Sequence, residues 1–195
     1  MFFNCSSLTA APELPATTLT NSCYSSMFSR CTSLAQAPAL PATTLANYCY
    51  SSMFYNCSSL TVAPELPATT LADNCYYSMF LGCSSLTTAP ALPISALVNG
   101  CYNGMFRNCT SLTSAPALPA TTLANSCYAY MFYGCTKLAS IDVSFSAWNP
   151  TNATTNWVTN TGSQATGTKT FACPSTLPKT TGNSNIPSGW TIIEK

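Results

Sequence analysis

Residues 31–57 read CTSLAQAPALPATTLANYCYSSMFYNC, and the same frame returns with a period of 26 along most of the chain. The pair Met-Phe marks the register, first at Met1 and then at Met27, Met53, Met79, Met105 and Met131. A fixed period between about 20 and 50 residues is typical of a solenoid, in which each repeat is one supersecondary unit stacked on the next. Five copies cover residues 1–130, and a sixth departs from the pattern after Leu138. We therefore expect an elongated stack of coils.

The second half of the frame has an apolar residue at every fourth position. In residues 31–57 this spacing places Leu45, Cys49, Met53 and Cys57 on one face of an α-helix, and Phe54 widens that face. The sequence therefore predicts a helix over residues 44–56 and its equivalents, although Gly100 and Gly104 would each weaken the fourth copy by up to about 1 kcal/mol relative to Ala. The predicted core columns are represented by Cys31, Leu45, Cys49, Met53, Phe54 and Cys57.

The first half of the frame is extended and rich in proline. Leu34, Ala37 and Leu40 alternate with Pro38 and Pro41, which lack the N–H that a sheet requires. Only a short strand is therefore expected in each repeat. Together the two halves predict an α/β solenoid, with short parallel strands on one face and helices on the other.

The repeat resembles the BspA-like class of bacterial leucine-rich repeats. That class typically reads I-P-x-x-V-x-x-I-x-x-x-A-F-x-x-C-x-x-L, and here L-x-x-x-C-x-x-x-M-F-x-x-C-x-x-L recurs in phase, with Met-Phe in place of Ala-Phe and three added residues. The resemblance covers residues 1–141. It implies a leucine-rich repeat fold, an origin in Bacteroidota surface proteins or their phages, and a role in adhesion or recognition.

The composition excludes several classes of function. Only 6% of residues are charged, the formal net charge is +1, and the chain lacks the clustered Lys and Arg that bind phosphate backbones. We therefore expect no nucleic-acid partner. The chain has no run of about 18 apolar residues, so no membrane-spanning helix is expected. No basic stretch followed by an apolar one opens the chain, so we expect a fragment of a longer precursor or export by another route.

The chain contains 12 cysteines, of which 11 belong to the repeat. The bridges that suit the repeat would join the two cysteine columns within each copy, as from Cys31 to Cys49. Two columns eight residues apart along a helix would lie about 12 Å from each other, and a disulfide needs Cα atoms within about 7 Å. We therefore favour buried free thiols that pack as small apolar side chains. An array of disulfides and a metal site remain as alternatives.

Nothing in the sequence predicts catalysis or a cofactor. The chain has no histidine, which excludes Ser-His and Cys-His nucleophile pairs. Glu13 and Glu65 occupy the same repeat position two coils apart, and we interpret them as two solvated carboxylates. We therefore expect a protein that is not an enzyme and binds no metal or cofactor.

Tyrosines occur both inside and outside the repeat pattern. One tyrosine follows the second core cysteine in every copy, and this column either seals neighbouring helices or forms an aromatic ladder for a ligand. Other tyrosines stand at positions that are not aromatic in most copies. These are the candidate ligand-binding residues: Tyr48, Tyr55, Tyr77, Tyr130 and Tyr133. Tyrosine suits a recognition surface because it has an apolar body and a polar tip.

The two ends of the chain differ from the repeats. Residues 1–141 form the predicted solenoid, and residues 142–195 contain all three tryptophans and predict a β-rich cap. Within the cap we expect strands at TKTFACP and GWTIIEK and a short helix near residues 154–159, with a separate sugar-binding domain as the alternative. Because Met1 falls in register with a buried column, we expect further repeats or another subunit of a homo-oligomer to cover the first coil.

These observations favour a non-enzymatic surface recognition or adhesion module that binds a protein or glycan ligand at the cell surface or outside the cell. The alternative is a structural or receptor-binding protein of a phage virion, such as a fibre or decoration component. The very low charge and the missing signal peptide favour the virion, whereas the family resemblance favours the cell surface.

Overall fold

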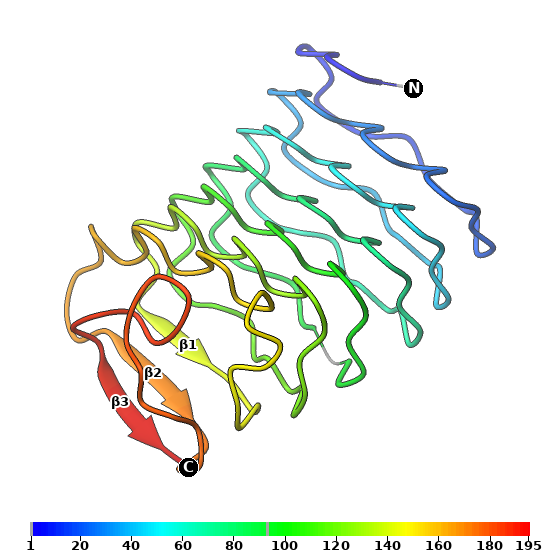
Figure 1. The fold of residues 1–195 in the computed structure, drawn as a ribbon. Helices are drawn as coiled ribbons and strands as arrows, with labels where there is room; N and C mark the ends of the chain where they lie inside the picture. Colours follow the sequence, from blue (N-terminus) through cyan, green and yellow to red (C-terminus); the bar gives the residue numbers. More distant parts are fainter. Residues whose placement is uncertain (1, 93) are drawn as a thin grey trace.

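The computed structural model of the protein describes residues 2–92 and 94–195. Its coils stack in a single row, with the two chain termini at opposite ends (Figure 1). Three short strands, β1 (Ser140–Asp142), β2 (Thr170–Cys173) and β3 (Thr191–Glu194), form a parallel sheet of order β1-β2-β3 at the C-terminal end. Met1, which the sequence places in a buried column, lies outside the described residues.

The prediction of helices on one face is wrong, because none of the described residues form a helix. Residues 47–56 and their equivalents instead form consecutive tight turns, and we call this segment of each coil the turn ribbon. In the second coil the N–H groups of Cys49, Met53 and Cys57 each donate to the carbonyl three residues earlier. The third residue of each of these turns has a positive φ, as in a type II turn. A positive φ at every fourth residue is incompatible with a right-handed helix.

The residue types at these positions explain the conformation. Three columns have positive φ along the array, and apart from three residues every member is Asn, Ser or Gly. Glycine has no Cβ to clash in this conformation, and asparagine tolerates it better than most residues. Gly100 and Gly104, which would weaken a helix, therefore fit the turn ribbon.

Alternate residues of the turn ribbon bond within a coil and between coils. The N–H groups of Tyr48, Tyr50, Ser52, Phe54 and Asn56 donate to carbonyls of the next coil, at N···O distances of 2.7–3.1 Å. The intervening residues donate within their own coil and accept from the coil before. Nearly every backbone N–H and C=O group of the turn ribbon in an internal coil is therefore paired, which a buried chain requires.

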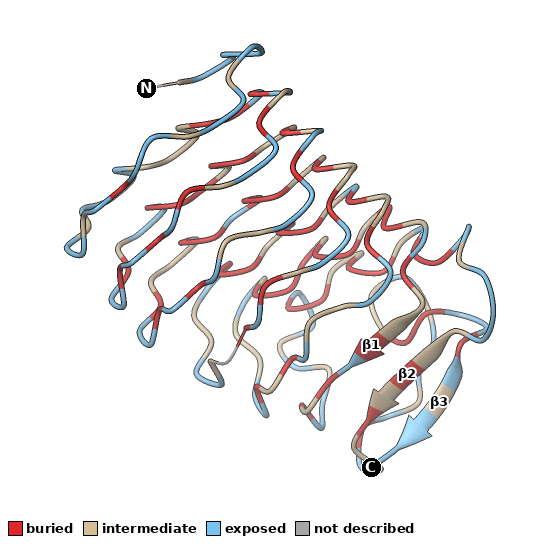
Figure 2. Ribbon diagram, turned by 180° about the vertical axis from the view of Figure 1, so that it is seen from behind, coloured by how far each residue is buried: buried red, intermediate tan, exposed pale blue. Residues whose placement is uncertain are grey.

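The period of four places the same residues inside as the expected helix. Cys31, Cys49, Met53, Phe54 and Cys57 have no exposed surface, and Leu45 is almost fully buried. Each phenylalanine of the Met-Phe pair stacks on its equivalent in the next coil, with ring centroids 5.5–6.0 Å apart. Buried residues line the inside of each coil except the first, which is largely exposed (Figure 2).

One cysteine column forms a ladder of hydrogen bonds through the core. The Sγ of Cys57 lies 3.1 Å from the carbonyl oxygen of Phe28, and the equivalent thiols of Cys31, Cys83, Cys109 and Cys135 contact the equivalent carbonyls at 2.9–3.1 Å. At the seventh position of the column, the hydroxyl of Thr161 donates to Phe132 at 2.8 Å. The cysteines are therefore both small apolar side chains and hydrogen-bond donors.

The extended half of each coil pairs with its neighbour at isolated points. Gln36 pairs with Ala10 on one side and with Val62 on the other, each in parallel register. The prolines near these positions cannot donate to a longer ladder, so the first full strand among the described residues is β1, which lies beyond the last A-P-x-L-P segment.

Residues 142–195 continue the array and close its C-terminal end. Residues 150–162 form a further coil in register, because Tyr128 and Phe132 donate to Ala153 and Trp157 in the same pattern that joins the earlier coils. The short helix expected near residues 154–159 is wrong, since these residues are turns with a positive φ at Asn156. β2 and β3 lie in the two segments that the sequence predicts as strands.

Candidate functional site

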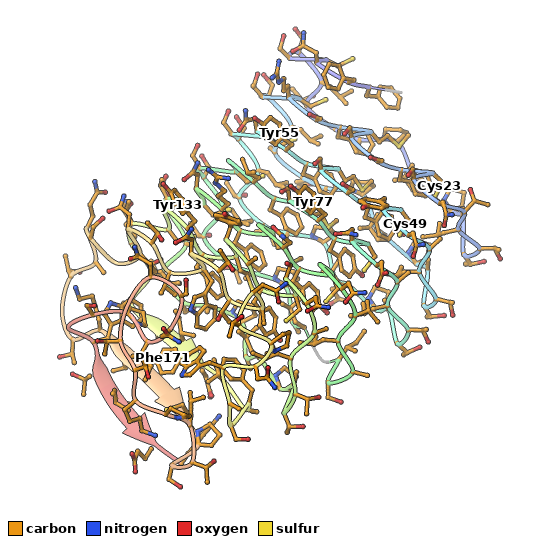
Figure 3. All side chains as sticks on the ribbon, viewed as in Figure 1. Cys23, Cys49, Tyr55, Tyr77, Tyr133 and Phe171 are labelled. Atoms are coloured by element: carbon orange, nitrogen blue, oxygen red, sulfur yellow. The ribbon has the colours of Figure 1, made fainter. Side chains whose placement is uncertain are left out.

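The five candidate tyrosines lie on the outward positions of the turn ribbons, a surface that we call the turn face. Tyr48 and Tyr77 are 46% and 39% exposed, whereas Tyr55, Tyr130 and Tyr133 are half-buried. Figure 3 shows Tyr55, Tyr77 and Tyr133 on the side of the array that faces the viewer. In other coils the same positions carry mainly Ser, Asn, Gly or Ala, so the tyrosines rise from a small and polar surface.

The repeated tyrosine column lies inside the molecule. Tyr50, Tyr76, Tyr102 and Tyr128 are at most 2% exposed and stack with ring centroids 5.8–6.1 Å apart. These distances are typical of offset-stacked rings. The column therefore seals neighbouring coils and offers no aromatic ladder to a ligand.

Three residues of the turn face break the preference for Asn, Ser or Gly at positive φ. Arg30, Tyr48 and Tyr130 have φ of 62°, 56° and 56°. Each bears a strain of about 1–2 kcal/mol that glycine would avoid. Bulky side chains retained in a strained conformation indicate a function for the side chain.

Two arginines contact these tyrosines across neighbouring coils. The Cζ of Arg107 lies 4.7 Å from the ring centroid of Tyr133 and 5.6 Å from that of Tyr130. At the other end of the turn face, the Cζ of Arg30 lies 5.9 Å from the ring of Tyr55. A guanidinium over a tyrosine ring is attracted by its negative face, so each pair holds its arginine in place.

Sequence reasoning missed both arginines. They look scattered in the sequence, because each is separated from its aromatic partner by about one repeat. The repeat period indicates one of these contacts, since Arg107 and Tyr133 occupy the same position of consecutive coils. Residues one period apart are neighbours in a solenoid.

The opposite side of the array carries a row of shallow depressions between successive coils. The depression of about 280 Å³ beside Leu66 is lined by Ala, Pro and Leu side chains, with Glu65 at its rim. Equivalent depressions lie one coil and two coils earlier, and the second of these has Glu13 at its rim. The two glutamates are exposed and lie on different depressions, as expected for solvated carboxylates.

The cysteines are free thiols, and those of the internal coils are buried. Burial raises the pKa of Cys49 to about 11 and that of Cys57 to about 12. Such thiols stay protonated near neutral pH and are poor nucleophiles. In the described part of the chain, no cluster of Cys, Asp or Glu side chains is arranged to hold a metal ion.

The tryptophans of the C-terminal region face inward. Trp157 has no exposed surface, and its indole N–H donates to the carbonyl of Asn185 at 2.8 Å. Trp148 donates to Pro178 at 2.9 Å and packs edge-on against Trp157. These rings fill the core and present no stacking platform to a sugar.

Comparison with protein families gives one match. The family described as BspA type leucine rich repeat region matches residues 1–113 and 65–153 in six copies. Comparisons with curated proteins and with solved structures give no match. Residues 2–92 and 94–195 contain no helix long and apolar enough to cross a membrane. The matched copies span more than half of the chain, which therefore belongs to the family of BspA-type leucine-rich repeats.

Proposed function

We propose that this protein is a non-enzymatic recognition module that acts outside the cell and binds a glycan or protein ligand through its turn face. Leucine-rich repeats are typically interaction modules, which supports the class of function. We choose the turn face as the binding surface because Arg30, Tyr48 and Tyr130 have bulky side chains at backbone positions of positive φ. Tyrosine and arginine are also, with tryptophan, the residue types enriched at binding hot spots.

The proposal predicts that tyrosine side chains on the turn face are required for binding. A variant would carry Tyr48→Ser, Tyr55→Ser, Tyr77→Ser, Tyr130→Ser and Tyr133→Ser. Serine occurs in another coil at each of these repeat positions, so the variant should fold. The matched control is Glu13→Ala with Glu65→Ala, because alanine stands at that position in the remaining coils and both residues lie on the opposite side.

The assay is binding of the purified protein to an array of neutral and charged glycans and to a panel of purified extracellular proteins. We expect the fivefold variant to lose at least tenfold in signal on every probe that the parent binds, and the control to retain it. Equal binding by the fivefold variant, or loss in the control alone, would refute the turn face as the binding surface.

A further inference from the structure

The Arg107 cluster on the turn face has features of a specific subsite. We define it as Arg107, Tyr130 and Tyr133, whose two rings lie 6.4 Å apart at 52° to each other. The guanidinium lies within 5.6 Å of both ring centroids, so two aromatic side chains restrict its position. An arginine held in this way loses little conformational entropy when it binds a ligand.

The positive charge of the Arg107 cluster is not balanced within the described residues. The ion pairs join Lys179 to Glu194 and Lys195 to Asp142, on the C-terminal sheet and its flank. Asp73 accepts hydrogen bonds from Asn99, and the other two carboxylates lie on the proline-lined side. Across residues 2–92 and 94–195, no acidic side chain therefore forms an ion pair with Arg107.

Two buried polar atoms beside Tyr133 lack hydrogen-bond partners. They are Nε of Arg107 and the hydroxyl of Thr159, which follows Tyr133 at the same position of the next coil. An unpaired buried polar group costs about 1–3 kcal/mol. The hydroxyl of Tyr50, in the stacked core column, is the third such atom among the described residues. In native structures a bound water, an ion or a ligand commonly supplies the missing partner.

The remaining donors of Arg107 define the chemistry of the ligand. The Nε of Arg107 is buried, so a ligand can bind only the two terminal guanidinium nitrogens. These two nitrogens lie in one plane and can each donate to one oxygen of a carboxylate. The surroundings are neutral hydrogen-bonding groups, including Asn108, whose amide oxygen would lie 2.2 Å from a Cβ at Gly134. One cation in a field of amides and hydroxyls suits a ligand with one carboxylate and many hydroxyls, and it suits a polyanion poorly.

We propose that Arg107, Tyr130 and Tyr133 form a subsite for the carboxylate of an acidic sugar, such as a sialic or uronic acid within a glycan. Arg107 binds the carboxylate, Tyr130 and Tyr133 hold the guanidinium and contact the sugar ring, and Asn108 is placed to bind hydroxyls. The subsite deepens the proposed function and rests on it, because it assumes that the turn face is the binding surface.

The test compares sugars that differ in one acidic group. The probes are 3′-sialyllactose against lactose, and tetragalacturonic acid against its methyl ester, with lactose 3′-sulfate to separate a carboxylate from a sulfate. Binding is measured by calorimetry and by ligand-observed NMR. The variant Arg107→Leu uses the residue that stands at position 81 of the preceding coil, and Tyr133→Ser uses the residue at position 29.

The matched control is Lys137→Ser. It removes the same charge from an exposed position, and serine stands at that repeat position in Ser7, Ser33, Ser59, Ser85 and Ser111. We expect the parent to bind at least one carboxylated probe tenfold or more tighter than its neutral partner, and Arg107→Leu to abolish that preference. Lys137→Ser should change it less than twofold.

Equal binding of acidic and neutral sugars, a stronger response to the sulfate, or equal losses in Arg107→Leu and Lys137→Ser would overturn the subsite. Binding of an acidic peptide in place of every sugar would also overturn it. If the parent binds neutral sugars or proteins and the fivefold tyrosine variant does not, the turn face still stands and only the acidic sugar is refuted. Circular dichroism of each variant establishes that it is folded.

Discussion

Alanine at position 104 distinguishes the turn ribbon from the helix that the sequence suggests, because the two architectures predict effects of opposite sign. In a helix, replacing Gly by Ala would stabilise the protein by about 1 kcal/mol. In the turn ribbon Gly104 has φ of +63°, and a Cβ there would lie 3.0 Å from the hydroxyl oxygen of Ser78. The left-handed conformation alone costs a residue with a Cβ about 1–2 kcal/mol.

We therefore expect Gly104→Ala to lower the free energy of unfolding by about 1–2 kcal/mol, since the serine hydroxyl can shift by a few tenths of an ångström. The assay is urea unfolding followed by far-ultraviolet circular dichroism, which reports on the whole array. Gly167→Ala is the matched control for strain alone, because Gly167 has φ of +80° and a Cβ at this position would meet no atom within 4 Å. Of these three variants Gly82→Ala should be the most damaging, because a Cβ there would lie 1.9 Å from the amide oxygen of Asn56, which must move away. A higher urea midpoint for Gly104→Ala would refute the turn ribbon.

Three further predictions concern the cysteines. The Cys109→Thr variant should keep the hydrogen bond to the carbonyl of Phe80, because Thr161 makes the equivalent bond to Phe132. The Cys109→Val variant cannot make this bond and should be less stable than Cys109→Thr by about 1 kcal/mol in urea unfolding. Equal stabilities of the two variants would show that the bond contributes nothing. In the native protein a thiol reagent should modify only Cys5 and Cys23 rapidly, because both are exposed and the other ten cysteines are buried, and intact mass spectrometry would reveal any faster core reaction. Above pH 9 the free energy of unfolding should fall by at least about 1.4 kcal/mol per pH unit in urea titrations. The reason is that the unfolded chain loses thiol protons that the folded chain keeps until the raised pKa is reached. A free energy of unfolding that stays constant between pH 9 and 11 would contradict the burial of these thiols. The thiols whose pKa is raised to about 11 or 12 are Cys49, Cys57, Cys75, Cys127 and Cys135.

The repeat frame predicts the coil and its interior, but not the backbone conformation on one side. A spacing of four residues is compatible with both a helix and a run of tight turns, so either conformation buries Cys49, Met53 and Cys57. The two differ in drift, because four residues turn a helix by about 400°, and three such steps displace the stripe by about 120°. A buried helical face would need an occasional spacing of three residues to stay in line. The buried residues of each repeat are spaced by four throughout, which favours a run of four-residue turns over a helix. The Asn and Gly residues at the repeat position shared by Asn56 and Gly82 are the second signal.

The turn-face tyrosines can be found in the sequence because they depart from their columns. Tyr77, for example, stands where other copies have Ser, Asn or Ala. Departure from a column does not show which residues contact each other, since the contact between Arg107 and Tyr130 depends on which side chains of adjacent coils point outward together. The period of the repeat shows which residues are neighbours in adjacent coils. The structure is needed to show which of their side chains touch.

The alternation of hydrogen bonds in the turn ribbon also orients peptide groups along the array. In the unit between Cys49 and Tyr50, the carbonyl accepts from the coil before and the N–H donates to the coil after. Every such unit points the same way, and each has a dipole of about 3.5 D. The stack therefore has an electrical polarity like that of an α-helix but with the opposite sense, negative toward its first coil and positive toward its last. At the positive end the carbonyl of Asn183 and the hydroxyl of Ser184 accept the final N–H groups. The two ends of the rod are thus chemically unlike, and stacking on the first coil suits a partner that offers N–H donors.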